Sequence, residues 1–263
     1  MHTAAAEPIL LVEIADGIAN LTLNRPQARN ALSTALMTEV EAALDRLAGD
    51  ASVKVVVLAA NGPAFCAGHD LKEMRGLEGE AAVAAVFAQC SRMMTKVVRL
   101  PKPVIAKVHA MATAAGCQLV ASCDMAFAAE GAAFATPGVN IGLFCSTPMV
   151  ALSRAVGRKQ AMEMLLTGKP IDARTAEDWG LVNRTVAAGD LDAVVAEMAL
   201  VIASKSPYTL KVGKEAFYRQ IEMGLDDAYA YASRVMTENM LAADAAEGID
   251  AFLSKRTPCW KGR

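Results

Sequence analysis

The order of apolar and polar residues predicts a hairpin, a helix and a buried strand at the start of the chain. The run ILLVEIADGIANLTLN, residues 9–24, holds two β-rich segments about an Asp-Gly pair, the pattern of a hairpin turn. After Ser33, apolar residues recur every three or four positions to about Gly49. This period predicts an amphipathic helix capped by the serine. The run VKVVVLAA, residues 53–60, predicts a buried strand.

The alternation of strands and helices continues through the first half of the chain. A helical period from Glu80 to Leu100 ends at Pro101 and Pro103. An apolar strand follows from Val104 to Val108, and the run DMAFAAEGAAFAT predicts two further short strands about Gly131. The first half therefore repeats strand, strand and helix.

From about Thr147 the pattern changes, and helical periodicity dominates to the C-terminus. No glycine-rich or proline-rich linker separates the two parts. We therefore predict one α/β core over residues 9–200, a helical C-terminal region over residues 201–263 and a flexible tail over residues 1–8.

Composition and charge narrow the class of protein. The 263 residues carry 26 basic and 28 acidic side chains without a basic stripe, which argues against a nucleic-acid partner. No apolar run reaches the ~18 to 20 residues that cross a membrane, so we expect no membrane partner. The six cysteines form no C-x-x-C pair and there are three histidines, which predicts reduced thiols, no metal and a cytoplasmic protein.

Two segments share a layout that exposes main-chain amides. In VVVLAANGPAFCAGHDLKEM and PVIAKVHAMATAAGCQLV, a buried strand runs into small residues with glycine and then into a helix. Amide groups at a helix N-terminus have no partner within the helix and carry partial positive charge, so two such turns could hold an oxyanion. The alternative is that the small residues only let a helix pack closely on a sheet.

The sequence motifs that bind dinucleotides or nucleoside triphosphates, and those of zinc proteases and α/β-hydrolases, are missing, so these classes of protein are not predicted.

Five segments together resemble the crotonase, or enoyl-CoA hydratase/isomerase, superfamily. They are LNRPQARNALS, FCAGHDLKEM, KPVIAKVHAMATAAGCQLVASCD, AMEMLLTGKPIDARTAEDWGLVN and EGIDAFLSKRTPCW, in that order along nearly the whole chain. The resemblance implies a right-handed spiral of ββα repeats with a helical C-terminal trimerisation region. It also implies an acyl-CoA thioester as ligand, with coenzyme A as part of the substrate and no tightly bound cofactor, and a homotrimer or a pair of trimers.

The resemblance also assigns roles to particular residues. Its two oxyanion-hole donors correspond to the amides of His69 and Ala115. The segment from Ala67 to Lys72 corresponds to the part that borders CoA. The complete set of implied CoA contacts is Arg25, Ala28, Ala67, His69, Asp70, Leu71, Lys72, Met111 and Gly116.

The departures from the family pattern concern proton transfer. Hydratases of the superfamily carry two glutamates, and this chain has Gln118 and Gly138 at those positions. Neither residue exchanges a proton near neutral pH. Cys145 is a further candidate as a nucleophile, or it only lines the pocket. ATAAGCQLVASCD and FATPGVNIGLFCSTP narrow the resemblance to one branch of the family that lacks the glutamates.

Other side chains have expected roles of their own. The His69 imidazole either meets the ligand or turns outward, and we expect it to be solvated. Asp70 is expected to cap the following helix and Asp124 to be structural. Three functions stay open: an enzyme that needs mainly oxyanion stabilisation, such as a decarboxylase, a thioesterase or a slow hydratase/isomerase; a non-catalytic acyl-CoA binder; and a structural oligomer.

Overall fold

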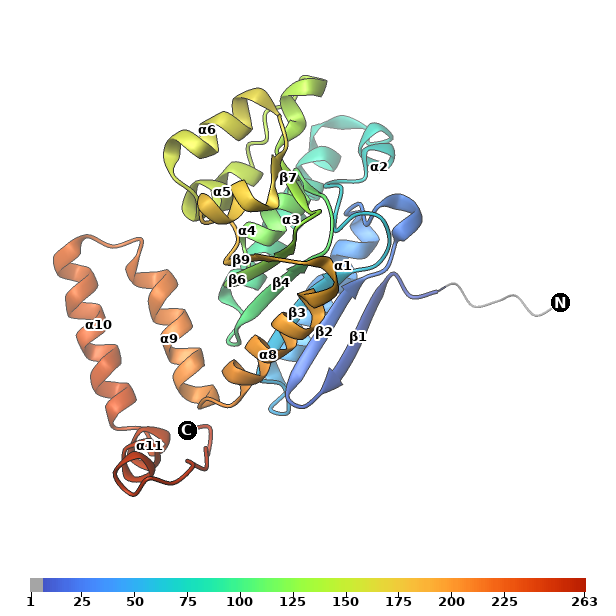
Figure 1. The fold of residues 1–263 in the computed structure, drawn as a ribbon. Coiled ribbons are helices and arrows are strands. Elements are labelled where there is room, and N and C mark those ends of the chain that lie inside the picture. Colours follow the sequence, from blue (N-terminus) through green and yellow to red (C-terminus); the bar gives the residue numbers. More distant parts are fainter. Residues whose placement is uncertain (1–6) are drawn as a thin grey trace.

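The computed structural model describes residues 7–263, and most of the tail predicted over residues 1–8 lies outside them. Figure 1 shows a sheet-centred core from which helices of the C-terminal part project.

The strands are β1 (Leu10–Ala15), β2 (Ile18–Leu23), β3 (Val55–Ala60), β4 (Val104–Val108), β5 (Ala112–Thr113), β6 (Met125–Ala129), β7 (Ala133–Ala135), β8 (Ile171–Asp172) and β9 (Arg184–Val186). The α-helices are α1 (Thr34–Gly49), α2 (Leu71–Arg75), α3 (Gly79–Arg99), α4 (Ala115–Ala121), α5 (Pro148–Ala155), α6 (Arg158–Thr167), α7 (Ala173–Asp178), α8 (Leu191–Ala203), α9 (Pro207–Gln220), α10 (Leu225–Met240) and α11 (Ala243–Leu253). Three 3-10 turns are η1 (Pro26–Ala28), η2 (Pro137–Ile141) and η3 (Ala188–Asp190).

The main sheet has six strands in the order β1-β2-β3-β4-β6-β9. β1 and β2 form the predicted antiparallel hairpin, with Leu10 opposite Leu23, and every later neighbour pairs in parallel. Parallel neighbours need crossover connections, which the helices supply. The fold is therefore mixed α/β with a largely parallel sheet, as predicted.

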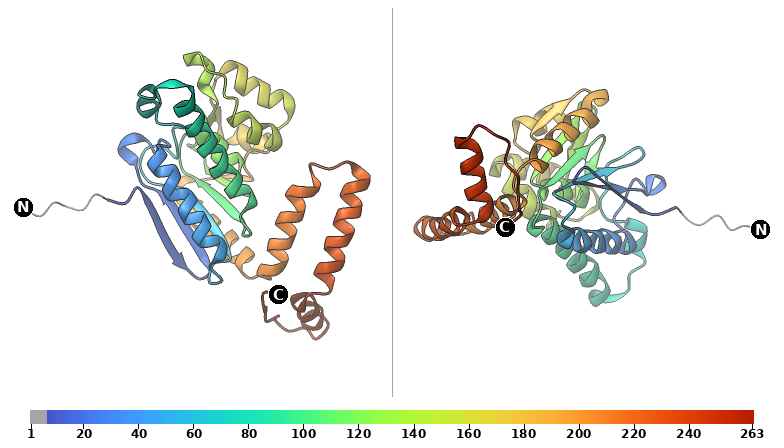
Figure 2. Two further views of the ribbon diagram at one scale, coloured as in Figure 1. Left: turned by 180° about the vertical axis from the view of Figure 1, so that it is seen from behind. Right: turned by 90° about the horizontal axis from the view of Figure 1, so that it is seen from below.

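Helices cover both faces of this sheet. α8 packs on one face, where its Leu191 and Val195 meet Val57 and Phe127 in one apolar cluster. Figure 1 shows α8 in front of the sheet, and the view from behind in Figure 2 shows α1 and α3 over the other face. The larger apolar cluster lies on that second face and includes α4. Burial on both faces explains why β3 is apolar throughout.

A second, three-stranded sheet lies beside the first, in the order β5-β7-β8. The two short strands predicted about Gly131 are present, yet they do not pair with each other. β6 continues the main sheet, whereas β7 pairs in parallel with β5. This pairing holds the segment after β7 beside the start of α4.

The C-terminal helices α9 and α10 differ from the core because neither contains a buried residue among those described. Large apolar side chains on them are exposed, including Phe217, Tyr229 and Met236. Figure 1 shows the two helices side by side and pointing away from the sheet, with α11 at their base. The predicted helical C-terminal region is confirmed.

Candidate functional site

The first glycine turn follows β3 and ends at α2. Gly68 has a φ of +87°, a backbone conformation that favours glycine. Its carbonyl accepts a hydrogen bond from the Leu32 amide at 2.8 Å, and the Asp70 amide donates to the Leu32 carbonyl at 3.2 Å. These two bonds fix the residue between them, so that the amide of His69 points away from Leu32. Among residues 7–263 this amide has no hydrogen-bond acceptor.

The second turn joins β5 to α4 and contains a strained alanine. Ala114 has φ 49° and ψ −118°, which is costly for a residue with a Cβ. Its amide donates to the Ala135 carbonyl of β7 at 2.8 Å, which holds the turn in place. The amide of the next residue, Ala115, opens α4 and has no acceptor within the part of the chain that the structure describes.

The two turns are locked against each other by backbone contacts. The Thr113 amide donates to the Cys66 carbonyl at 2.9 Å. Gly116 lies so close to that carbonyl that an added Cβ would stand 2.2 Å from the oxygen. A Cβ added at Gly68 would stand 3.3 Å from the Ala115 nitrogen. The two turns therefore lie against each other, with Gly68 beside the Ala115 nitrogen, and small residues allow that approach.

The side chain of His69 turns into the protein. Its ring meets the Phe87 ring of α3 edge to face, with centroids 5.4 Å apart and planes at 85°. Both ring nitrogens are buried without a hydrogen-bond partner. Burial lowers the pKa of His69 from 6.5, against the opposing effect of the Glu73 carboxylate, so the ring is neutral at pH 7. The expectation of a solvated ring is wrong, because α3 covers the turn.

The start of α2 carries several of the residues expected to contact CoA. The Asp70 carboxylate accepts hydrogen bonds from the amides of Lys72 and Glu73, which confirms it as the helix cap. Arg25 forms a salt bridge to Asp70 at 3.1 Å. Leu71 and Lys72 are exposed on this helix. Ala28, Ala67 and Met111 are half-buried, whereas Gly116 is buried.

Unpaired buried polar atoms gather around the two turns. Within residues 7–263, the buried side-chain atoms without a hydrogen-bond partner are both ring nitrogens of His69, Oε1 of Gln118 and Oγ1 of Thr136. Gln118 follows Ala115 by one turn of α4, and Thr136 follows the residue that anchors Ala114. Because buried polar groups are normally paired, such a gathering marks this region as different from the rest of the core.

Gly138 stands where there is no room for a side chain. An added Cβ would lie 2.5 Å from the Leu143 carbonyl oxygen and 2.9 Å from Sγ of Cys145. The loop after η2 therefore fills the space that any side chain at this position would need.

Cys145 is a poor candidate for a nucleophile. Its side chain is buried, and burial raises the pKa of its thiol above 9.0, so the thiol stays protonated at pH 7. Cys66, Cys90 and Cys117 are shifted in the same direction, each to a pKa of about 12, by burial. Packing, the other role considered for Cys145, fits its contact with Gly138.

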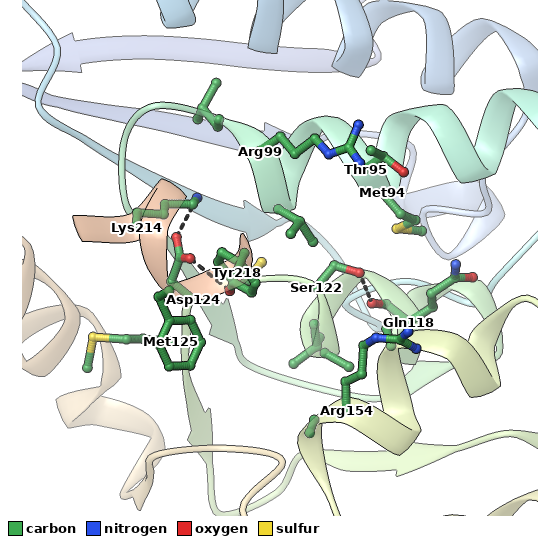
Figure 3. A pocket seen from close by; sticks show the side chains of 18 of the residues that line it. Met94, Thr95, Arg99, Gln118, Ser122, Asp124, Met125, Arg154, Lys214 and Tyr218 are labelled. Carbon is green, nitrogen blue, oxygen red and sulfur yellow. Dashed lines mark hydrogen bonds and ion pairs between the residues drawn. The ribbon is translucent and has the colours of Figure 1, made fainter. Parts of the chain in front are cut away.

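A cavity of about 1050 Å³ begins at Gln118 and runs between α3, α4, α5 and α9. Figure 3 shows Gln118 on one side of it and Asp124 on the other, where Lys214 and Tyr218 of α9 reach the carboxylate. The Lys214 ammonium donates at 2.7 Å and the Tyr218 hydroxyl at 2.9 Å. Asp124 also accepts from the Val104 amide, so its structural role fits the prediction.

The sequence did not single out Lys214 and Tyr218. The spacing of i and i+4 places them on one helix face, and this is the only local signal. Burial lowers the pKa of the Lys214 ammonium, and the nearby Asp124 carboxylate opposes that shift. Lys214 also donates to the carbonyls of Val97 and Lys102. The pair therefore fastens α9 to the core at the far end of the cavity.

The described residues contain neither a metal site nor a membrane-spanning helix. No group of three or more His, Cys, Asp or Glu side chains in residues 7–263 is placed to hold a metal ion. No helix in the same range is both long and apolar enough to cross a bilayer. The paired glycine turns are therefore the candidate functional site.

A spiral α/β core with two such turns facing each other defines the crotonase class of fold. The Enoyl-CoA hydratase/isomerase family matches residues 13–263, and the chain belongs to this family. An enoyl-CoA hydratase from Mycobacterium smegmatis has a solved structure that is 53% identical and covers 97% of this chain and 99% of its own, with a TM-score of 0.94.

The branch predicted from the sequence is confirmed. The human enoyl-CoA hydratase domain-containing protein 3, mitochondrial, is 47% identical over 93% of this chain and 81% of its own length. The solved structure of the human protein covers 96% of this chain and all of its own at 45% identity, with a TM-score of 0.94. A probable enoyl-CoA hydratase of Rhizobium meliloti is 38% identical over 97% of this chain and 98% of its own.

The prediction of a cytoplasmic protein is wrong by this comparison. The relatives from rat, mouse, human and Xenopus laevis are all named mitochondrial. The six cysteines are indeed unpaired in the described chain. Unpaired thiols argue against an oxidising compartment, but they do not choose among the reducing ones.

Proposed function

We propose that this protein binds an acyl-CoA thioester and polarises its carbonyl between the amides of His69 and Ala115. The observation that carries the proposal is the meeting of two unpaired amides from separate turns, locked by the hydrogen bond from Thr113 to Cys66. Fixed amide donors stabilise negative charge on a carbonyl oxygen where it develops, as an enolate or a tetrahedral oxyanion.

CoA would lie along the surface that the first turn and α2 form together. Lys72 and Leu71 are exposed there and offer a cation and an apolar contact. Arg25, Ala28, Ala67, Asp70, Met111 and Gly116 complete the proposed contacts. Arg25 is tied to Asp70 at 3.1 Å, so it would position the start of α2 as well as meet the ligand. The acyl group would point toward Gln118 and the cavity beyond it.

Efficient hydration of an enoyl-CoA is not what these residues favour. Gln118 can orient a water molecule but cannot act as its base, and Gly138 has neither a side chain nor space for one. Losing general acid–base help costs ~100 to 10,000-fold per group. We therefore place the protein in the hydratase/isomerase class by family and assign it a reaction that depends mainly on oxyanion stabilisation.

A non-catalytic acyl-CoA binder is the second candidate function. It is favoured by the same absence of a carboxylate at the two hydratase positions. A decarboxylase or thioesterase would also need only the amide pair at the carbonyl. Turnover of a panel of acyl-CoA esters separates these enzymes from a binder.

We also propose that copies of the chain assemble, as a trimer or a pair of trimers. The support is the exposed apolar surface of α9 and α10, where Phe217 of α9 and Met236 of α10 are 54% and 67% exposed. Contiguous apolar surface of this kind marks association sites. Sedimentation velocity of the full chain tests the assembly, and a monomer at micromolar concentration would contradict it.

Calorimetric titration with butyryl-CoA tests the central proposal. Gly68→Ala puts a methyl group 2.9 Å from the Ala114 Cβ and 3.3 Å from the Ala115 nitrogen. We expect its Kd to rise by about tenfold or more, or about 1.4 kcal/mol. Gly79→Ala is the matched control, because Gly79 has a φ of +79° and nothing within 4 Å of an added Cβ. Equal binding by both variants, or no binding by the unmodified protein, would overturn the proposal.

A further inference from the structure

We propose that the His69 imidazole is a catalytic base, which takes a proton from the α-carbon of the bound acyl group. The inference rests on the proposed function, because the thioester must lie at the two amides. It assigns to the side chain of His69 a role separate from that of its amide. The imidazole of His69 would then form the enolate, and the amide of the same residue would stabilise it.

The ring is free to accept a proton. Both of its nitrogens are buried and neither has a hydrogen-bond partner in the described structure. In a neutral imidazole one nitrogen carries a proton and the other a lone pair, and the tautomer decides which. A buried lone pair with no donor facing it is uncommon in a folded protein. The arrangement suits a group whose partner arrives with the ligand.

The ring belongs to the residue whose amide would receive the carbonyl oxygen, so it lies within a few bonds of that amide. It contacts Phe87 of α3, with ring centroids 5.4 Å apart. Ser91, Met94 and Thr95 follow Phe87 at helical spacing and line the cavity. The helix against which His69 packs therefore also forms one wall of the cavity that begins at Gln118.

The surroundings of the ring keep it neutral. Burial lowers the pKa of His69, and two effects oppose that shift: first the charge of the Glu73 carboxylate of α2, then an approach of the ring to the Leu32 backbone that falls short of a hydrogen bond. That carboxylate is itself engaged by the amide and hydroxyl of Thr34. The Asp70 carboxylate is held by Arg25, α3 contributes the uncharged Phe87, and Leu32 contributes backbone. A neutral ring is the form that can act as a base.

The step balances without any co-reactant. The imidazole nitrogen takes the α-proton, and the C–H electron pair forms the carbon–carbon double bond of an enolate. The carbonyl π pair moves to the oxygen, where the amides of His69 and Ala115 receive it. The reverse step returns a proton to carbon. In D2O the returned proton is replaced by deuterium, so the α-position becomes labelled.

Proton NMR of butyryl-CoA in D2O measures this exchange directly. We expect the unmodified protein to remove the α-proton signal faster than buffer does. His69→Gln keeps the amide and a polar side chain, and it should slow exchange by ~100 to 10,000-fold while Kd changes by less than about threefold. His109→Gln is the matched control, because the His109 ring bonds the Gly62 carbonyl and His109 is not among the residues proposed to touch the ligand. It should leave both exchange and Kd unchanged.

The pH profile gives a second readout. Exchange should rise with pH until His69 loses its proton and then stay level, and the midpoint of the rise should lie below pH 6.5 because burial lowers the pKa from that value. A purely structural role for His69 would not produce this profile.

The outcomes separate the inference from the proposed function. If butyryl-CoA binds but the unmodified protein exchanges no proton, the inference fails and the proposed function stands. If His69→Gln exchanges as fast as the unmodified protein, His69 is not the base. If butyryl-CoA does not bind, the proposed function itself fails. The melting temperature of His69→Gln, compared with that of His109→Gln, shows whether the variant is folded, and crotonyl-CoA binding provides a second check on its site.

Discussion

The two halves of the candidate site are built differently. The backbone half consists of the amides of His69 and Ala115, and hydrogen bonds within the fold hold it rigidly. The side-chain half consists of Gln118, with an unpaired carbonyl oxygen, and Gly138, beneath a loop that fills its space. The first half is fixed by main-chain contacts, whereas Gln118 in the second half contributes a side chain that can be exchanged without moving the backbone. The backbone half would determine the class of ligand and the side-chain half the reaction, so the reaction can change while the class of ligand stays the same.

The difference has a physical origin. The amide positions depend on contacts of main chain with main chain, such as Thr113 with Cys66, and almost any side-chain change leaves those contacts in place. Only the glycines are indispensable, because a Cβ at Gly116 would meet the Cys66 carbonyl. Proton transfer depends instead on single side chains. One substitution removes it.

The largest expected effect comes from breaking the backbone half at Gly116. Gly116→Ala places a Cβ 2.2 Å from the Cys66 oxygen, so the two turns must separate. We expect butyryl-CoA binding to be lost and the free energy of unfolding to fall by about 3 kcal/mol, measured by urea titration. Gly49→Ala, with nothing within 4 Å of the added Cβ, is the control and should be nearly neutral. A stable Gly116→Ala variant with normal binding would contradict the account of the two turns.

A smaller effect is expected from restoring the side-chain half. Gln118→Glu changes no volume, whereas Gly138→Glu meets the Leu143 carbonyl at 2.5 Å. We expect Gly138→Glu to lower the free energy of unfolding by ~1 to 3 kcal/mol and not to add to any crotonyl-CoA hydration gained by Gln118→Glu.

Gly131→Glu, which has open space around its Cβ, controls for the added charge in that test. If the double variant Gln118→Glu/Gly138→Glu hydrates crotonyl-CoA faster than Gln118→Glu alone, the loop that contains Leu143 must move to accommodate the second glutamate. Hydration by the unmodified protein at a rate that neither variant exceeds would show that the two glutamates are not needed.

Much of the fold could be predicted because its signals are local. The Asp-Gly turn, the Ser33 cap and the prolines that end α3 act within a few residues of where they stand, and each appears in the structure. The pairing of β7 with β5 was not predicted, because it depends on where the chain returns in space. The same reason hides the bond from Lys214 to Asp124.

The candidate site follows the same division. The positions of the two turns could be predicted, since glycine and alanine between a strand and a helix have a clear physical meaning. The orientation of the His69 ring could not, because α3 covers it from a distant part of the chain. Nor could the sequence show that Leu143 closes the space beside Gly138.

The smallest expected effect is a pH dependence of stability caused by the buried His69 ring. Its pKa in the folded protein lies below 6.5 because burial disfavours the charged form, with the Glu73 carboxylate opposing the shift. Well above pH 6.5 the ring is neutral in both the folded and the unfolded state, and the full stability is present. As the pH falls below that value, the unfolded chain binds a proton first, so stability declines until the folded ring is protonated too.

Urea unfolding between pH 7 and pH 5 measures this decline. His69→Gln should lose less stability over the interval than the unmodified protein, while His109→Gln should lose about as much, because its ring bonds the Gly62 carbonyl outside the candidate site. If the free energy of unfolding varies with pH in the same way for the unmodified protein and His69→Gln, burial of the ring does not shift its pKa. The site would then differ from the rest of the core only in its amides.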